Sequence, residues 1–173
     1  KIGTGTAPIP RMLERGVRVA LGTDGAGTND NLILQESLRL AAMLHRPQEP
    51  DRSRWLSAQD VLRMATEGGA NALLEQGRIG SIETGKRADL VLYSLDAPWW
   101  VPMNDPLNQF VFAENGSSAD TVIVEGRILV EDRQVVAFDA DSILAEGRTM
   151  MQEILKRNAG IYSLAQKIGD FFP

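Results

Sequence analysis

The first part of the chain combines two hydrophobic periodicities. Residues 17–21 (Val-Arg-Val-Ala-Leu) place larger apolar side chains at every second position, and this alternation predicts a β-strand. A polar, glycine-rich loop follows at 22–31. On either side of these segments, apolar residues recur every three or four positions, as in helices with one buried face. We therefore expect helices at 9–15 and 32–46, the second stopped by Pro47.

A further helix is expected to begin at Ser57-Ala58-Gln59-Asp60. This stretch has the form of a capping box, in which a serine hydroxyl and an acidic side chain three residues later satisfy free amide groups of the first turn. The apolar positions that follow supply one face for burial. Gly68 and Gly69 weaken the helix, so we expect it to break there, before 71–74.

From residue 77 onwards, short strands and turns dominate the pattern. Glu125-Gly126-Arg127 is typical of a tight hairpin turn with glycine at the critical position. The expected strands lie within 79–95, which a turn at 83–86 interrupts, and at 121–124, 128–130 and 134–137. The expected helices lie at 107–113 and 141–156. The last helix offers a set of apolar side chains for burial: Ile143, Leu144, Met150, Met151, Ile154 and Leu155.

Composition narrows the class of protein. Of the 173 residues, 43% are hydrophobic and 24% are charged, a balance typical of globular rather than disordered proteins. The net charge of −5 and the lack of any Lys/Arg run argue against nucleic-acid binding. No apolar stretch approaches the length of a membrane span. With no cysteine, disulfides, thiol nucleophiles and Cys-based zinc sites are excluded, and we expect a cytoplasmic protein.

Asp24 stands where the expected strand runs into the glycine-rich loop, and three roles are open to it. The stretch Gly25-Ala26-Gly27 could cradle a phosphate, but Asp30 replaces the third glycine of that motif, and a carboxylate repels phosphate. Asp24 could instead cap amide groups of its own loop. Finally, a carboxylate at the carboxyl end of a barrel strand could bind a metal ion and accept a proton from water.

Three stretches bear on this choice. The first runs from Ala7 through Ala20-Leu-Gly-Thr-Asp-Gly25 to Asn31, the second is Gly80-Ser-Ile-Glu-Thr-Gly-Lys-Arg-Ala-Asp-Leu-Val91, and the third is Asp120-Thr-Val-Ile-Val-Glu-Gly-Arg127. Together they resemble the C-terminal third of amidohydrolase-superfamily enzymes. The branch is that of the deaminases and chlorohydrolases, with its adenosylhomocysteine/methylthioadenosine deaminases and triazine hydrolases.

The resemblance implies an α/β fold, a TIM-like (β/α)8 barrel joined to a small composite β-sandwich. Residues 1–76 would form the last portion of the barrel. Residues 77–137 would form the C-terminal part of the sandwich, with a loop at 97–118 that packs on the barrel, and residues 138–173 a C-terminal helical segment. The family takes further sandwich strands from its N-terminal segment. Unpaired edges invite association, so we expect a homo-oligomer or association with that N-terminal portion.

The resemblance also implies one divalent metal ion, with zinc favoured over iron. The family holds it with a His-x-His pair, two further histidines and the aspartate that ends the eighth strand. Only that aspartate has a counterpart here: the resemblance makes Asp24 both a metal ligand and the catalytic general base. His45 is the single histidine of the chain, and we interpret it as structural because a last helical turn favours that residue. Since the other ligands are missing, we expect the isolated chain to be inactive.

Other polar and aromatic residues have two interpretations each. Asn29 and Asn31 could contact a substrate, but such residues commonly cap a following helix, which is the role that we favour. Trp99 and Trp100 could stack on an aromatic ring, but packing is the commoner role for such a pair.

The sequence thus predicts the C-terminal portion of a hydrolase. It would act on a C–N bond, but not a peptide bond, or on a C–halogen bond, in an aminated heterocycle of the purine, pterin or triazine type. Water activated by the metal would be the nucleophile. The expected partner is this small-molecule substrate, with no nucleic acid and no membrane. The alternative is a catalytically silent piece that serves only as a structural or interaction module.

Overall fold

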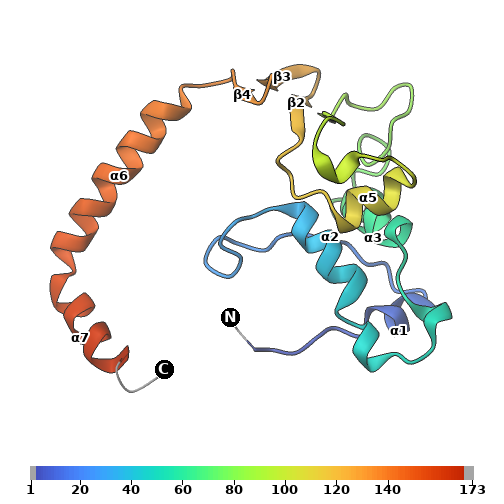
Figure 1. Cartoon of the computed structure of the whole chain (residues 1–173), viewed down its shortest axis with the longest axis horizontal. Helices are drawn as coiled ribbons and strands as arrows, with labels where there is room; N and C mark the ends of the chain where they lie inside the picture. The colour runs from blue at the N-terminus through green and yellow to red at the C-terminus, as the bar shows by residue number, and fades with distance from the viewer. Residues whose placement is uncertain (1–2, 170–173) are drawn as a thin grey trace. The chain divides into compact units, whose positions relative to one another are not determined.

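The computed structural model describes residues 3–169, which fall into two compact units, one up to Arg133 and one from Gln134 onwards (Figure 1). The first unit is α/β. Its helices are α1 (Ile9–Glu14), α2 (Leu34–Met43), α3 (Ala58–Ala65), α4 (Glu67–Ala72) and α5 (Pro106–Phe112), with 3-10 turns η1 (Arg46–Gln48), η2 (Arg52–Arg54) and η3 (Pro98–Trp100). Its strands are β1 (Leu90–Tyr93), β2 (Ala119–Val124) and β3 (Arg127–Glu131). The second unit contains the short strand β4 (Gln134–Val135) and the helices α6 (Ala140–Arg157) and α7 (Ala159–Gly169).

The hydrophobic core of the first unit lies where α2, α3 and α5 meet. Leu38 from α2, Val61 from α3 and Val111 from α5 are buried there, and half-buried side chains of α1 pack around them. Burial of side chains of this size stabilises a fold by about 1.5–3 kcal/mol each. Helix packing therefore holds the unit together around the segment that carries Asp24.

Local sequence signals explain where two of these helices begin. The capping box predicted for α3 is confirmed: the Ser57 side chain accepts from the Asp60 amide at 3.2 Å, and the Ser57 amide donates to Asp60 Oδ2 at 2.8 Å. Helix α5 starts with Pro106 behind Asp105, whose side chain accepts from the Asn108 amide at 2.9 Å. Both devices satisfy amide groups that a first helical turn leaves without partners.

The structure agrees with the predicted positions of the helices more closely than with their predicted first and last residues. The helices expected at 9–15, 32–46 and 107–113 are confirmed as α1, α2 and α5. Helix α2 begins later than expected, because Leu32 has a positive φ of 54° and Ile33 is extended, and it also ends earlier, at Met43. The break expected at the glycine pair is wrong in position. It falls at Thr66 (φ −106°, ψ −84°), and both glycines lie inside α4.

The strand expected at 17–21 is wrong for the part of the chain that the structure describes, because no sheet contains this segment. A strand needs a neighbouring strand for its hydrogen bonds. Here the segment lies against α3 and α4 instead: the Leu21 amide donates to the Met64 carbonyl at 3.0 Å. A side chain on Gly68 would meet the Val19 carbonyl oxygen at 2.6 Å, so the backbones approach closely there.

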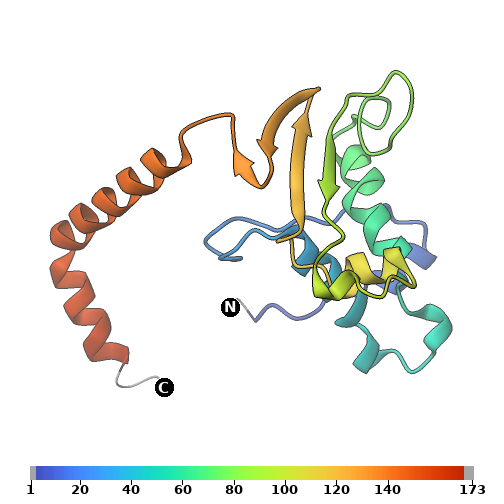
Figure 2. The ribbon, with the colours of Figure 1, turned by 45° about the horizontal axis from the view of Figure 1, so that its top comes forward.

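Strands β1, β2 and β3 of the first unit form an antiparallel sheet in that order (Figure 2). The predicted hairpin of β2 and β3 is confirmed, as is a strand at the end of the 79–95 segment. Register places Leu90 opposite Ile123 and Val91 opposite Val122. Because adjacent residues of a strand point to opposite faces, the sheet has apolar side chains on both faces.

The turn of the β2–β3 hairpin gives a stability prediction. Gly126 has a φ of 78°, where a Cβ atom costs about 1–2 kcal/mol. Gly126→Ala should therefore lower the free energy of unfolding by about 1–2 kcal/mol in urea titrations of the chain. Gly77→Ala is the matched control, since Gly77 lies in a connection with open space around it and no positive φ. Equal losses in the two variants would contradict this account of the turn.

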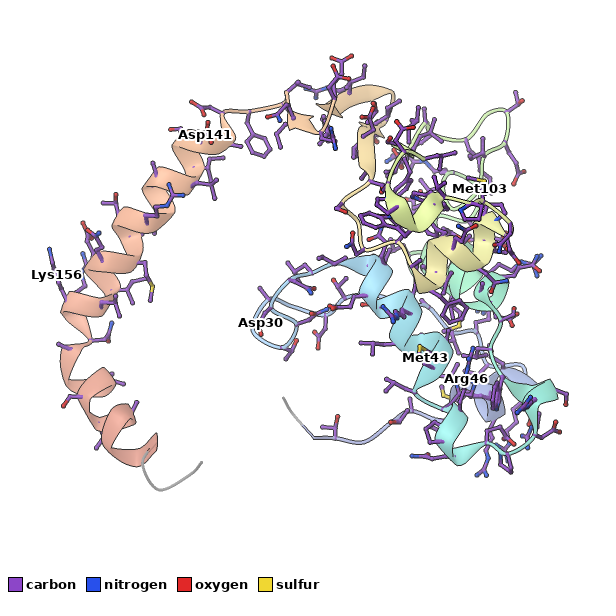
Figure 3. All side chains as sticks on the ribbon, in the orientation of Figure 1. Asp30, Met43, Arg46, Met103, Asp141 and Lys156 are labelled. Carbon is purple, nitrogen blue, oxygen red and sulfur yellow. The ribbon has the colours of Figure 1, made fainter. Side chains whose placement is uncertain are left out.

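The second unit consists mainly of exposed helices. Helix α6 extends the predicted helix by a residue at each end, and the Asp139 side chain caps it by accepting from the Ser142 amide at 3.0 Å. In Figure 3, Asp141 and Lys156 mark its two ends. The expected burial of its apolar face is wrong: Met150 is 56% exposed and Leu155 is 41% exposed. Among the described residues of this unit, no layer covers the apolar side chains of α6. No helix among residues 3–169 is both long and apolar enough to cross a bilayer.

Candidate metal-ligand loop

The candidate site is the loop from Thr23 to Asn31, which connects the 17–21 segment to α2. Asp24 has a φ of 63°, in the left-handed region that aspartate and asparagine enter more readily than other non-glycine residues. In Figure 3 the label at Asp30 marks this loop, and the labels at Met43 and Arg46 mark the other end of α2.

The Asp24 carboxylate is exposed and ionised at neutral pH. The Gly25 amide donates to its Oδ1 at 2.7 Å. This hydrogen bond, followed by the interaction with the Thr28 side chain, holds the pKa of the Asp24 carboxyl below its usual value, against a smaller opposing effect of burial. An exposed, charged carboxylate of this kind can bind a hard or borderline divalent cation, and it can also accept a proton.

Three other side chains of the loop, those of Thr28, Asn29 and Asn31, make hydrogen bonds within the loop or to the start of α2. Asn29 Nδ2 donates to the Thr23 carbonyl at 2.9 Å, and the Thr28 hydroxyl donates to the Gly25 carbonyl at 2.9 Å. Asn31 Oδ1 accepts from the Ile33 amide at 2.9 Å, while its Nδ2 donates to Glu36. The helix-capping role favoured for Asn29 and Asn31 is wrong, because the N-cap residue of α2 is Ile33 and no side chain caps the helix. Both side chains instead bond to neighbouring residues and support the loop. Direct contact of either with a substrate stays a prediction.

His45 lies at the opposite end of α2 from this loop. Helix α2 has 10 residues, and a helix of that length spans about 15 Å. The buried His45 ring accepts a hydrogen bond from the Leu56 amide at its Nε2, at 3.1 Å. Since zinc–nitrogen bonds are about 2 Å long, Asp24 and His45 do not bind one ion in this structure. The contact with Leu56 agrees with the structural role expected for His45.

The role of Asp24 as a metal ligand stays a prediction, because no metal site is complete among the described residues. Within residues 3–169, no three His, Cys, Asp or Glu side chains come together in a way that could hold a metal ion. Zinc sites generally need three or four protein donors. The chain as described therefore offers a single ligand in a suitable loop.

Trp99 and Trp100 are tied to a residue that sequence reasoning missed, Glu114. The Glu114 side chain is only 3% exposed, and its Oε2 accepts from Trp99 Nε1 at 2.8 Å and from Trp100 Nε1 at 3.0 Å. Its Oε1 accepts from the amides of Asn115 (3.1 Å), Gly116 (2.7 Å) and Ser118 (3.2 Å). The tryptophans therefore pack and donate within the protein. A lone glutamate has no sequence signature that could have revealed this role.

Comparison with known proteins shows the family to which the chain with this loop belongs. The model of the amidohydrolase family matches residues 1–129, so the chain belongs to that family. Curated relatives include the 5-methylthioadenosine/S-adenosylhomocysteine deaminase of Syntrophobacter fumaroxidans. It is 39% identical over 154 residues, which are 89% of this chain and 35% of the relative. The 5'-deoxyadenosine deaminase of Methanosarcina mazei is 38% identical over 157 residues, covering 91% of this chain and 36% of the relative.

Solved structures give the same family. An adenosine deaminase from Xanthomonas campestris with bound zinc superposes with a TM-score of 0.85 at 33% identity, covering 90% of this chain and 35% of that one. The atrazine chlorohydrolase of Arthrobacter aurescens in complex with zinc superposes with a TM-score of 0.80 at 38% identity. The match covers 86% of this chain and 33% of the chlorohydrolase chain. The family membership predicted from the sequence is confirmed. The chain spans about a third of the length of these relatives.

Proposed function

We propose that this chain is the C-terminal portion of a metal-dependent amidohydrolase. The enzyme would hydrolyse a C–N bond, or a C–halogen bond, on an aminated heterocycle. The observation that carries the proposal is the exposed, ionised carboxylate of Asp24, set at a left-handed turn in a chain of the amidohydrolase family. The names of the relatives support nucleosides and triazines as substrate classes.

Asp24 has two roles in this proposal. As a ligand, its carboxylate would help to hold one divalent ion, for which the zinc-bound relatives favour zinc. When bound, such an ion lowers the pKa of a coordinated water towards about 7. As a general base, the Asp24 carboxylate accepts a proton from the attacking water and passes it to the departing amine. The further ligands would come from parts of the enzyme outside this chain.

The proposed architecture follows the family resemblance. Residues 1–76 would be the last portion of a (β/α)8 barrel, and residues 77–137 part of a composite β-sandwich. Residues 138–173 would be a C-terminal helical segment. The open apolar faces of the sheet and of α6 support this proposal, because both are suited to contact with further structure.

The zinc and iron content of two preparations tests the function. We expect the 173-residue chain, purified without added metal, to hold no stoichiometric metal, since its residues 3–169 bring no three potential ligands together. The native polypeptide with its natural flanking segments should hold about one zinc per chain and should release ammonia from aminated purine nucleosides. A native polypeptide without metal or hydrolase activity would favour the structural module instead.

A further inference from the structure

The backbone at Asp24 needs support from its surroundings. A non-glycine residue in the left-handed region is less stable than in the helical or extended regions, and it persists where neighbouring groups hold it there. The Asp24 φ of 63° therefore depends on contacts made by other residues of the loop. The Gly25 amide, which donates to the Asp24 carboxylate at 2.7 Å, is correctly aimed only while this turn is kept.

Two side chains hold the residues on either side of Asp24. Asn29 Nδ2 binds the carbonyl of Thr23, which precedes Asp24, and the Thr28 hydroxyl binds the carbonyl of Gly25, which follows it, each at 2.9 Å. The amides of Thr28 and Asn29 also donate to the Gly25 carbonyl, at 3.0 and 2.9 Å. Thr28 and Asn29 are half-buried in a loop whose other residues are mostly exposed.

We propose that Thr28 and Asn29 are positioning residues for Asp24, which rests on the proposed function of Asp24 as ligand and base. They clamp the peptide units on both sides of the carboxylate and so fix the direction in which it projects. Asn31 does not belong to this clamp, because its side chain bonds to Ile33 and Glu36 at the start of α2. The interpretation of Asn29 thus changes from a helix cap, with substrate contact as the alternative, to a support of the carboxylate.

The loop itself can be tested in the 173-residue chain by amide ¹⁵N relaxation. In Asn29→Ala, the order parameters of Asp24 and Gly25 should fall from about 0.85 to below about 0.6. Asn71→Ala is the matched control. It removes the same kind of bond, from Nδ2 to a main-chain carbonyl at 2.9 Å, in helix α4. Unchanged order parameters in Asn29→Ala would overturn the clamp, whatever the enzyme does.

The catalytic consequence can be tested in the native polypeptide loaded with zinc. Asn29→Ala and Thr28→Val should lower kcat by about 10- to 100-fold, because a small displacement of a reacting group is costly. KM should change by less than about twofold, since the clamp does not touch the substrate. Zinc affinity, measured by competition with a chelator, should fall by about 10- to 100-fold, as for other groups that orient a ligand.

The matched variants separate positioning from folding. Thr28→Ser keeps the hydroxyl and should retain near wild-type kcat and zinc affinity, as should Asn71→Ala. Wild-type kcat in Asn29→Ala, or equal losses in Thr28→Ser and Thr28→Val, would overturn the positioning role. A wild-type polypeptide without zinc or activity would overturn the proposed function. The order parameters would still decide whether the clamp exists.

Discussion

Asp24→Asn is expected to lower the kcat of the native enzyme by about 10²- to 10⁴-fold, the range typical for the loss of a general base. The fold of the chain should be unaffected. Asparagine tolerates the left-handed region as aspartate does, and its side-chain oxygen can still accept from the Gly25 amide. What is lost is the negative charge and, with it, the ability to take up a proton and to neutralise a cation.

Two measurements check this prediction. Initial rates of ammonia release give kcat for wild-type and variant enzyme, and thermal unfolding of the 173-residue chain reports on the fold. Asp24→Ala serves as a second variant that loses the loop hydrogen bond as well, so its unfolding temperature should fall below that of Asp24→Asn. An Asp24→Asn enzyme that retains more than about a tenth of wild-type kcat would contradict the role of base.

Glu114→Ala should be the most destabilising single substitution outside the apolar core, with a loss of at least about 3 kcal/mol. Its carboxylate accepts from two indole groups and from three main-chain amides. Without it, the buried Trp100 indole and the buried Ser118 amide lose this acceptor, at about 1–3 kcal/mol each, and three part-buried donors lose it as well. Glu114→Gln, which keeps the shape but offers an amide nitrogen to donors, should lose less than Glu114→Ala.

Denaturant titration monitored by circular dichroism would measure these losses, with Glu131→Ala as the control on an exposed strand residue. We expect that control to change the free energy of unfolding by less than about 0.5 kcal/mol. A Glu114→Ala protein as stable as the control would show that water replaces the carboxylate without cost.

The same carboxylate should make stability depend on pH at the acidic end. Burial by itself raises the pKa of Glu114, but hydrogen bonds from Trp99 and from the Gly116 and Ser118 amides outweigh burial, and the pKa is lowered. A lowered folded-state pKa means that the stabilisation is complete above the unfolded-state value of about 4.3. It is lost as the pH falls through the folded-state value. Glu114→Gln should lack this part of the acid dependence.

Parts of the fold with local causes were predictable from sequence. The capping box at Ser57 and Asp60 and the glycine at Gly126 carry their own geometry, and both appear where expected. The 17–21 segment and the apolar face of α6 were misjudged because their state depends on partners. The alternation at 17–21 indicates a strand only when another strand lies beside it, and apolar residues of α6 are buried only against a facing layer.

In the candidate site, too, features with a local cause were predictable from the sequence and features that depend on distant partners were not. Asp24 was found because a carboxylate between an apolar run and a glycine-rich loop is a local pattern. The clamp formed by Thr28 and Asn29 was not found from the sequence, because it depends on the path of the loop, which brings Asn29 back to Thr23. Glu114 escaped for a similar reason: its five donors come from two separate segments, 99–100 and 115–118.

The bonds of Glu114 give the chain a built-in optical probe. Two of its three tryptophans, Trp99 and Trp100, share one charged acceptor, so their emission should shift when that acceptor is neutralised. The third, Trp55, donates to the Glu49 carbonyl at 2.7 Å, with the Arg46 guanidinium 4.9 Å from its ring centre. Since that carbonyl does not titrate, the emission of Trp55 should stay constant with pH. A change in the tryptophan fluorescence of the chain would then report protonation of the buried Glu114 carboxylate.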